Sequence, residues 1–421
     1  MMNASSLLID IGGTDIKFAL SLGTNLISES IVRVPFPQFL DANEKTISAS
    51  QYLKLVKTSI TSYLEHHNKP DQILISGQVG SWILTTPEGK NLTEIVSWQC
   101  TNKSETDLLT EIYQSNYSDA FSPLSETGNE NWDGAPWKVL PKYLSELSET
   151  ATQIYFHSLI SWTVWELTSK NLFIIHKTDA AATGMYSIIR EKWLGNFEGM
   201  SKDIRFPNVL KSIQYAGNFE DTDIKVYVGI GDQQASLLGV GITSDAFVIN
   251  AGTGGQVARL LPSYQESNYK IRPYFDGQYI ETITHIPSGR YISSFLQFLT
   301  QTKGDVFQWE WVWEQGFVKA EDKKEIEIEN WNFDKYLEKI DTTTDSIILI
   351  NNFLDLICQN FIEKLETLGC RENDVIILAG GVATKLKRLR FSLLQQNYRY
   401  SDTGSLETTL QGLAKLSDKL D

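Results

Sequence analysis

Four times in this chain of 421 residues, a short apolar segment expected to form a β-strand runs directly into a turn rich in glycine. The turns are Gly12–Thr14, Gly229–Asp232, Gly252–Gly255 and Gly380–Gly381. Glycine lets a backbone approach a ligand closely, and the amides of such turns are ready donors to anions. Each turn alone could serve only the backbone, but the four together favour an α/β fold that binds a nucleotide.

The first and third turns share one pattern. The predicted strands Ser6–Ile11 and Ala246–Asn250 each lead into a glycine turn with a threonine, and a second predicted strand follows, Lys17–Ser21 or Gln256–Leu260. This similarity recurs after about 240 residues and is a weak internal repeat. It suggests two related domains with a nucleotide cleft between them.

The second turn carries an acid. In VYVGIGDQQASLLGVG (226–241), Asp232 lies between a predicted strand with its glycines and a helix-like run of small and apolar residues. A helix N-terminus stabilises negative charge, so Asp232 could present a carboxylate to a substrate, but Asp is also a common N-cap. This segment alone supports both interpretations equally.

The composition is that of an ordinary globular protein, with 42% apolar and 21% charged residues and a formal net charge of −15. An acidic surface does not attract nucleic acid or an anionic membrane, so neither is an expected partner. The scattered cysteines Cys100, Cys358 and Cys370 lack metal-ligand spacing and favour a reducing compartment. No signal peptide and no run of the roughly 20 apolar residues that span a membrane is found, so a cytoplasmic protein is expected.

Further elements follow from periodicity. Helical spacing predicts helices at Tyr52–Glu65, Tyr155–Ser169 and Ser346–Leu368. Trp309, Trp311 and Trp313 alternate at the period of a strand, and the charge run Glu321–Asn330 is expected to be a solvated face.

Taken in order, these segments resemble motifs of the FGGY carbohydrate kinases, which belong to the superfamily of sugar kinases, actin and heat-shock chaperone ATPases. LIDIGGTDIKFAL resembles the first phosphate motif, FVINAGTGGQVARL the second and VIILAGGVATKLKRLR the adenosine motif, while VGIGDQQASLLGVG is similar to the segment around the catalytic Asp. ILISGQVG, HKTDAAATG and SLETTLQGLAKLS resemble the sugar-facing segment, the T-D-x-S-x-A stretch and the Glu-x(4)-Gly-x-Ala segment. The matches keep the family order over almost the whole chain.

The resemblance implies two ribonuclease H-like (actin-like ATPase) domains with a nucleotide and sugar cleft between them. Residues 1–243 would form the sugar side with the catalytic Asp, and residues 244–421 the ATP side. The implied activity is transfer of the γ-phosphoryl group of ATP, with Mg²⁺, to a hydroxyl of a small ketose or polyol, a ketopentose or ketoheptose being favoured. The implied partners are that sugar or polyol and ATP/ADP, and a homodimer is a possible assembly.

The resemblance also implies roles for single residues. Asp232 would be the general base and would also contact the substrate, and Asp10 would hold Mg²⁺. Lys17 is either a cation near the γ-phosphate or a solvent-facing strand residue, and Asp15 is a ligand or a turn residue. The other residues implied in nucleotide binding are Gly12, Gly13, Thr14, Gly252, Thr253, Gly254, Gly380 and Gly381.

The sugar side agrees less well with the family pattern. Gln78 and Trp98 fall in sugar-facing segments and are candidate substrate-binding residues, although both could lie behind the site or in the core. Asp179 could likewise be a helix cap. Gly80 stands where many members carry His or Glu, and Cys100 stands where they carry Asp, so polar anchors for a sugar are missing.

Two other interpretations stay open. The altered sugar segment is compatible with a non-catalytic nucleotide-binding module, against which the acids at positions 10 and 232 argue. IDIGGTDIK also resembles the opening of the glucokinase-like ROK group, but the scattered cysteines and GDQQAS argue against it. The sequence does not identify the sugar or the hydroxyl that would be phosphorylated.

Overall fold

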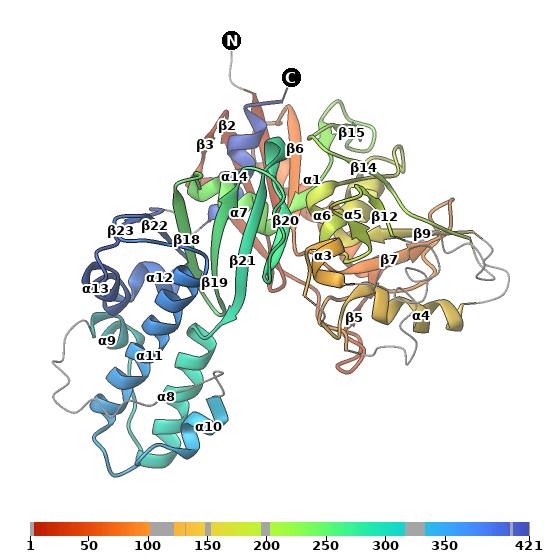
Figure 1. Cartoon of the computed structure of the whole chain (residues 1–421). Helices are drawn as coiled ribbons and strands as arrows, with labels where there is room; N and C mark the ends of the chain where they lie inside the picture. Colours follow the sequence, from red (N-terminus) through yellow and green to blue (C-terminus); the bar gives the residue numbers. More distant parts are fainter. Residues whose placement is uncertain are drawn as a thin grey trace. The chain divides into compact units, whose positions relative to one another are not determined.

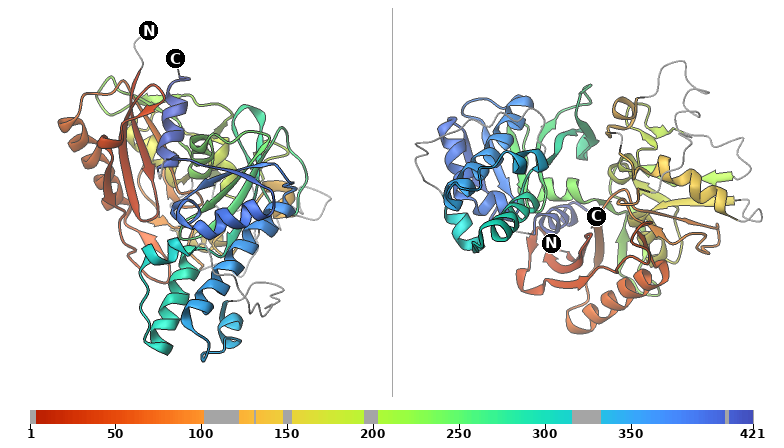
Figure 2. Two further views of the ribbon diagram at one scale, coloured as in Figure 1. Left: turned by 90° about the vertical axis from the view of Figure 1, so that its left-hand side faces the viewer. Right: turned by 90° about the horizontal axis from the view of Figure 1, so that it is seen from below.

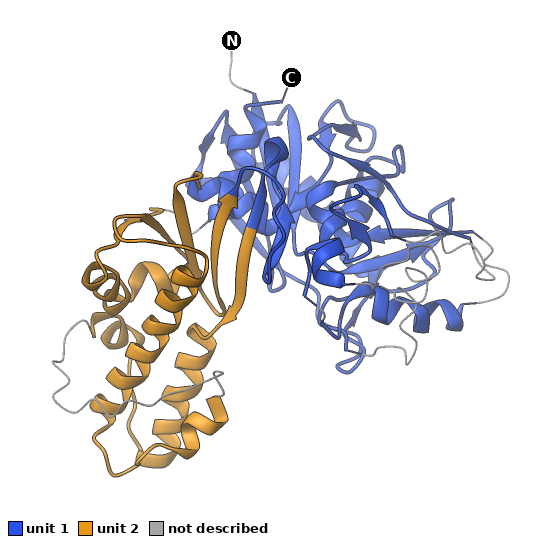
Figure 3. Cartoon of the chain, in the orientation of Figure 1, with its two compact units in different colours: residues 1–241, 261–280, 407–421 blue, residues 242–260, 281–406 orange. Residues whose placement is uncertain are grey.

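The computed structural model describes residues 4–101, 122–130, 132–147, 153–194, 203–315, 333–404 and 407–420 (Figures 1 and 2). The chain forms two compact units (Figure 3). Unit 1 comprises residues 1–241, 261–280 and 407–421, and unit 2 comprises residues 242–260 and 281–406. Compactness alone does not define a domain, so the boundary at 243/244 stays a prediction.

Unit 1 contains a mixed sheet in the order β15-β16-β6-β1-β2-β3, with β17 paired to β6 and β4 to β2. Its strands are β1 (Ser5–Ile11), β2 (Asp15–Leu22), β3 (Asn25–Leu26), β4 (Val32–Pro35), β6 (Gln72–Gly77), β15 (Tyr215–Asn218), β16 (Lys225–Tyr227) and β17 (Ile230–Gly231). Every residue of β1 after Ser5 is buried, which is typical of a strand covered on both faces. The predicted hairpin is confirmed: β1 and β2 are antiparallel.

Alternate residues of β1 enter different cores. Leu7 and Ile9 pack with α1 (Ala49–His66) and α5 (Leu159–Leu167). Leu8 packs instead with α7 (Asp232–Val240) and α14 (Thr408–Ser417). The period of two along the strand therefore fixes helices on both faces of the sheet.

A second sheet of unit 1 has the order β13-β9-β7-β8-β5. Its strands are β5 (Thr46–Ile47), β7 (Trp82–Thr85), β8 (Ile95–Val96), β9 (Gln153–Ser158) and β13 (Asp203–Arg205). The remaining elements of this unit are the pairs β10 (Ile174–His176) with β14 (Asn208–Leu210) and β11 (Tyr186–Ser187) with β12 (Lys192–Trp193), helices α3 (Pro123–Thr127), α4 (Pro136–Glu146) and α6 (Lys177–Ala182), the 3-10 turns Ser28–Ser30 and Phe275–Gly277, and strand β20 (Lys270–Pro273).

The predicted helix Tyr155–Ser169 is wrong in its first four residues. They belong to β9, whose Ile154 and Phe156 are buried in the core beneath the second sheet. Ser158 then caps α5, because its Oγ accepts a hydrogen bond from the Ser161 amide at 3.0 Å. Burial of alternate residues outweighed the helical spacing that the apolar run displays.

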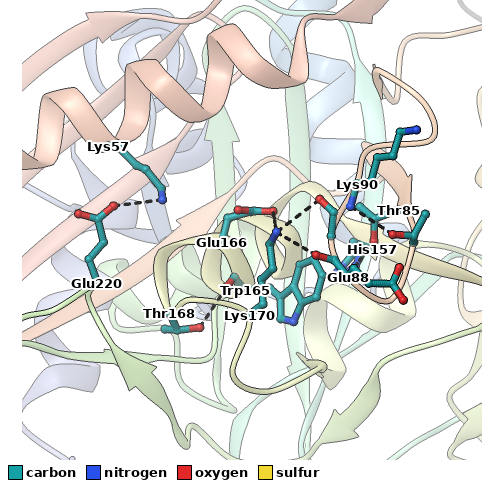
Figure 4. A network of polar contacts seen from close by, with 12 residues as sticks. Lys57, Thr85, Glu88, Lys90, His157, Trp165, Glu166, Thr168, Lys170 and Glu220 are labelled. Carbon is teal, nitrogen blue, oxygen red and sulfur yellow. Dashed lines mark hydrogen bonds and ion pairs between the residues drawn. The ribbon is translucent and has the colours of Figure 1, made fainter.

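A polar network ties the end of α5 to the loop after β7 (Figure 4). The Lys170 ammonium donates to the carbonyl oxygen of Glu88 at 3.2 Å and lies 3.7 Å from the Glu166 carboxylate. His157 on β9 contacts the Thr85 hydroxyl at 3.2 Å, and burial lowers the pKa of His157 to about 3, so the ring is neutral. None of the residues predicted to bind ligands belongs to this network, which we interpret as structural.

The main sheet of unit 2 has the order β21-β19-β18-β22-β23, to which β20 adds an outer strand. Its strands are β18 (Ala246–Ala251), β19 (Gly255–Leu261), β21 (Tyr279–Ile286), β22 (Val375–Ala379) and β23 (Arg399–Asp402), and its helices are α8 (Gly289–Lys303), α9 (Trp309–Glu314), α10 (Phe333–Glu338), α11 (Ser346–Thr367), α12 (Gly381–Lys385) and α13 (Lys387–Gln395). The internal repeat is confirmed: the antiparallel pair β18–β19 has the parallel neighbour β22, as the pair β1–β2 has β6.

The strand-like alternation of the tryptophans was misleading. Trp309 begins α9, and its ring stacks on that of Trp313 at 4.7 Å, as residues four apart on a helix do. The charge run Glu321–Asn330 lies outside the described residues. Among the helices of the described ranges, none has the length and apolar character that crossing a membrane requires.

The closest helix packing in unit 1 joins α7 to α14 through glycines. A Cβ atom at Gly412 would lie 1.8 Å from the carbonyl oxygen of Ala235, and one at Gly239 would lie 1.8 Å from that of Thr408. We expect Gly412→Ala to lower the free energy of unfolding by about 3 kcal/mol or more, because the backbones must separate. Urea denaturation measures this, with Thr409→Ala on the same helix as control; equal midpoints for the two variants would contradict the prediction.

Candidate active site

Three adjacent parallel strands of unit 1 end at one edge of the sheet. In the register of β1, β6 and β17, Ser76 lies beside both Asp10 and Ile230, and Gly77 lies beside Gly231. Gln78 follows β6 directly, and Asp232 follows β17. Residues predicted from three separate motifs therefore meet at the carboxyl ends of neighbouring strands, where open α/β sheets bind ligands.

Asp232 is the first residue of α7 and not its N-cap, which is Gly231. Its Oδ1 accepts a hydrogen bond from the Gln233 amide at 2.8 Å. Burial raises the pKa of Asp232 to about 6, while this hydrogen bond and the nearby Arg272 oppose the rise. A carboxylate with such a pKa can accept a proton near neutral pH.

Asp10 faces a cation across the β1–β2 hairpin. Its partner in the register is Lys17, whose Nζ lies 3.6 Å from Asp10 Oδ2 and 2.8 Å from Glu407 Oε2. Glu407, just before α14, also pairs with Arg33. Burial raises the pKa of Asp10 to about 7 against the opposing charge of Lys17. Lys17 thus points to carboxylates and is not a simple surface residue.

In the turn between β1 and β2, one backbone amide already has a hydrogen-bond acceptor inside the turn. The Gly12 amide donates to the Asp15 carbonyl at 3.0 Å, so this amide is engaged within the turn. Gly13 and Thr14 are exposed, which suits donors to a ligand. Asp15 is the first residue of β2. A Cβ atom on Gly13 would lie 3.5 Å from Gln78 Oε1, so the turn and the sugar-side candidate are neighbours.

On the sugar side, Gln78 is buried, and its Oε1 accepts a hydrogen bond from Trp98 Nε1 at 3.0 Å. The Trp98 side chain keeps 43% of its surface exposed, so its ring can meet a ligand. Cys100 is fully buried in the core beneath the second sheet and cannot contact a sugar. Gly80, with a φ of +85°, supplies no side chain.

The T-D stretch supports the turn before Asp232 through residues that sequence reasoning missed. Thr178 Oγ1 accepts a hydrogen bond from the Gly231 amide at 3.1 Å and shares a second hydrogen bond with His176 Nδ1 at 2.9 Å. Burial lowers the pKa of His176 to about 3, so its ring is neutral. His176 is also the cap of α6, so Asp179 is not. The only signal for this support in the sequence was the histidine two residues before Thr178.

Asp179 is a completely buried acid next to this relay. Its Oδ2 accepts a hydrogen bond from Ser158 Oγ at 2.5 Å, and no hydrogen bond joins its Oδ1 to a described residue. Burial raises the pKa of Asp179 to about 7, and the Asp232 charge adds to the effect. A third acid therefore shares the electrostatic environment of Asp232.

In unit 2, the two remaining turns are neighbours because Asn250 of β18 lies beside Ala379 of β22. The carbonyl oxygen of Gly252 accepts hydrogen bonds from Ser288 Oγ at 3.1 Å and from the Gly289 amide at 3.0 Å, which fix the turn. Thr253 and Gly254 are exposed. The turn borders a pocket of about 320 Å³ whose lining residues are Asn250, Gly252, Gly254, Gly255, Gln256 and His285.

The Gly380–Gly381 turn opens α12 with an unusual backbone. Gly380 has a φ of +82°, and a Cβ atom there would lie 2.5 Å from the Ala251 carbonyl oxygen. Only glycine fits this position. A Cβ atom on Gly381 would meet no atom within 4 Å, so this residue borders open space.

Comparisons with known proteins agree with this architecture. The structure is similar to xylulose kinase from Lactobacillus acidophilus, with a TM-score of 0.75 at 16% identity over 98% of this chain and 89% of that one. Gluconate kinase from the same organism gives 0.77 at 14% identity, covering 99% and 89%. Plasmodium falciparum glycerol kinase with ADP gives 0.73 at 15% identity, covering 98% and 89%. The expected fold of two actin-like ATPase domains is thereby confirmed.

In sequence, the chain is 26% identical to glycerol kinase from Staphylococcus epidermidis over 181 residues, which are 40% of this chain and 35% of the relative. The match thus spans about a third of the length of that kinase. Residues 5–239, more than half of the chain, match the N-terminal domain of the FGGY family of carbohydrate kinases. The family predicted from the ordered motifs is confirmed, and the chain belongs to the FGGY family of carbohydrate kinases.

Proposed function

We propose that this protein transfers the γ-phosphoryl group of ATP to a hydroxyl of a small sugar or polyol, with Asp232 as the general base. The observation that carries the proposal is the meeting of Asp10, Gln78 and Asp232 at one edge of the unit 1 sheet. Small ketoses and polyols are the proposed acceptors, with ketopentoses and ketoheptoses first. Relatives of known structure include xylulose, gluconate and glycerol kinases, which define the first acceptors to assay.

In the proposed reaction, Asp232 accepts the proton of the attacking hydroxyl and orients its oxygen in line with the γ-phosphate. Phosphoryl transfer needs little covalent help, so positioning and charge stabilisation supply most of the catalysis. Lys17, Gly13 and the hydroxyl of Thr14 would contact phosphate oxygens from unit 1. Gly252, Thr253 and Gly254 are the proposed phosphate-binding residues of unit 2, and Gly380 and Gly381 would lie beside the adenosine.

The residues present fit a magnesium ion. Kinases commonly hold Mg²⁺ by one or two carboxylates together with phosphate oxygens and water, so no cage of several protein ligands is needed. The described residues contain no cluster of three or more His, Cys, Asp or Glu side chains suited to a metal. Asp10 would hold the ion, whose chemistry is to offset charge on the phosphates. The charges of Asp232 and Glu407 repel that of Asp10, and a cation bound at Asp10 would offset this repulsion.

We expect Asp232→Asn to lower kcat by a factor of about 100 to 10,000, because the amide cannot accept the proton. The measurement is ADP release on a panel of ketoses, polyols and aldonates, with product identified by mass spectrometry. Asp223→Asn is the matched control, since Asp223 is exposed and pairs with Lys69. Full acceptor-dependent turnover by the Asp232 variant would refute the assigned base. ATP binding without product on any acceptor would favour a non-catalytic module.

The pH dependence of kcat/KM should report the ionisation of Asp232. The base works only when ionised, and the pKa of Asp232 is raised to about 6. We therefore expect kcat/KM of the wild-type enzyme to rise about tenfold per pH unit below pH 6 and to level off above it. The residual activity of Asp232→Asn should lack this rise below pH 6, which is the acid limb of the profile. A limb that persists unchanged in the variant would assign the titration to another acid.

A further inference from the structure

Arg272 lies on β20 and is held against the first turn of α7, where Asp232 is. On one side, the Ile271 amide donates to the Gly128 carbonyl at 3.0 Å. On the other, the Pro273 carbonyl accepts from Gln234 Nε2 at 3.1 Å, two residues beyond Asp232. Hydrogen bonds to both neighbouring residues thus fix the backbone at Arg272 next to the first turn of α7.

The guanidinium of Arg272 is charged and makes no bond to a described residue. Its Nε is enclosed, and neither a hydrogen bond nor an ion pair joins the side chain to the described part of the chain. Burial lowers the pKa of Arg272 to about 10, while the charges of Asp232 and Glu130 favour the ionised form. An enclosed donor without an acceptor costs free energy, so such a group calls for a ligand.

The other cation of β20 already has a partner. Lys270, two residues away, pairs with Glu130 at 3.3 Å. Arg272 therefore differs from Lys270, although both come from the same short strand.

Among the described residues, the sugar-side positions 80 and 100 supply no polar group for this role. Cys100 lies in the core, Gly80 has no side chain, and the Gln78 amide oxygen is bonded to Trp98. A site that discriminates sugars needs donors that stay unpaired unless the right acceptor is bound. Arg272 has donors of this kind and comes from a segment that the sequence comparison of motifs did not include.

We propose that Arg272 binds the acceptor, with its guanidinium donating to two neighbouring oxygen atoms beside the hydroxyl that faces Asp232. The inference rests on the proposed function and names a specificity-determining residue for it. A planar fork of donors fits either the carboxylate of a sugar acid or two adjacent hydroxyl oxygens of a ketose or polyol. Arg272 would thus replace the anchors that positions 80 and 100 lack.

The test compares Arg272→Gln and Arg272→Lys with wild type. We expect both variants to raise KM for the acceptor by a factor of about 10 to 100, since hydrogen bonds from a charged donor are lost or misplaced. KM for ATP should stay unchanged. Arg205→Gln is the matched control, because it removes the same charge from an exposed arginine of unit 1. Melting temperatures identify any variant that fails to fold, and the lysine variant keeps the charge where glutamine does not.

The low-pH side of the pH profile reports whether the Arg272 charge acts on Asp232, while KM for the acceptor reports whether Arg272 binds it. Loss of the Arg272 charge should shift the acid limb to higher pH in Arg272→Gln, because the positive charge no longer favours the Asp232 carboxylate. Aldonates and neutral ketoses or polyols are assayed as separate arms. A loss confined to aldonates assigns a carboxylate as ligand, and a loss with neutral acceptors assigns the hydroxyl pair.

Acceptor KM values within twofold of wild type in both variants would overturn the role of Arg272 while leaving the kinase proposal intact. If wild type turns over no acceptor, the proposed function fails, and calorimetric binding of D-xylulose, glycerol and gluconate without ATP tests Arg272 directly. Binding that weakens in Arg272→Gln would support its role, and equal or absent binding to wild type and variant would overturn it.

Discussion

The parallel register of β1, β6 and β17 is the constraint on which the candidate site depends. Hydrogen bonds between these strands place Asp10, Ser76 and Ile230 at one level of the sheet, and Gln78 and Asp232 follow two residues further along their strands. A slip of one residue in a strand would turn its side chains to the opposite face. Near-continuous burial of β1 by cores on both faces resists such a slip. The chemistry of the edge is therefore a consequence of how the sheet is packed.

The candidate site buries several ionisable side chains, although burial disfavours the charged form of each. Asp10, Asp179 and Asp232 are carboxyl groups whose pKa values burial raises, and Arg272 is a guanidinium whose pKa burial lowers. Perturbed groups of both signs gather at functional sites more often than elsewhere. Packing of α14 on α7 helps to hold the cluster, because the chain just before α14 carries Glu407 to Lys17.

Local sequence signals predicted some parts well and misled in others. The glycine turns and the strands before them were found because tight turns restrict residue type strongly. The start of α5 was predicted wrongly, because an apolar run is equally compatible with a helix and a strand. The core residues around Ile154 and Phe156 determine that this part is a strand. Trp309 and Trp313 have a spacing that also fits a strand, but they lie in a helix and their rings stack there. The sequence left open whether Asp179 and Asp232 are helix caps, and the structure shows that His176 and Gly231 are the caps of these helices.

The sequence by itself determined the family, the repeated hairpin and turn, and the acids at positions 10 and 232, because these depend on residue type and order. The tertiary structure alone decided which of them meet. In the tertiary structure, Lys17 pairs with Glu407, which lies almost a whole chain away in sequence. Thr178 accepts a hydrogen bond from the amide before Asp232, and Cys100 is buried in a core. The tertiary structure also set Arg272 beside the first turn of α7. The reason is physical: strand pairing and burial bring distant segments together, and no local pattern encodes those distances.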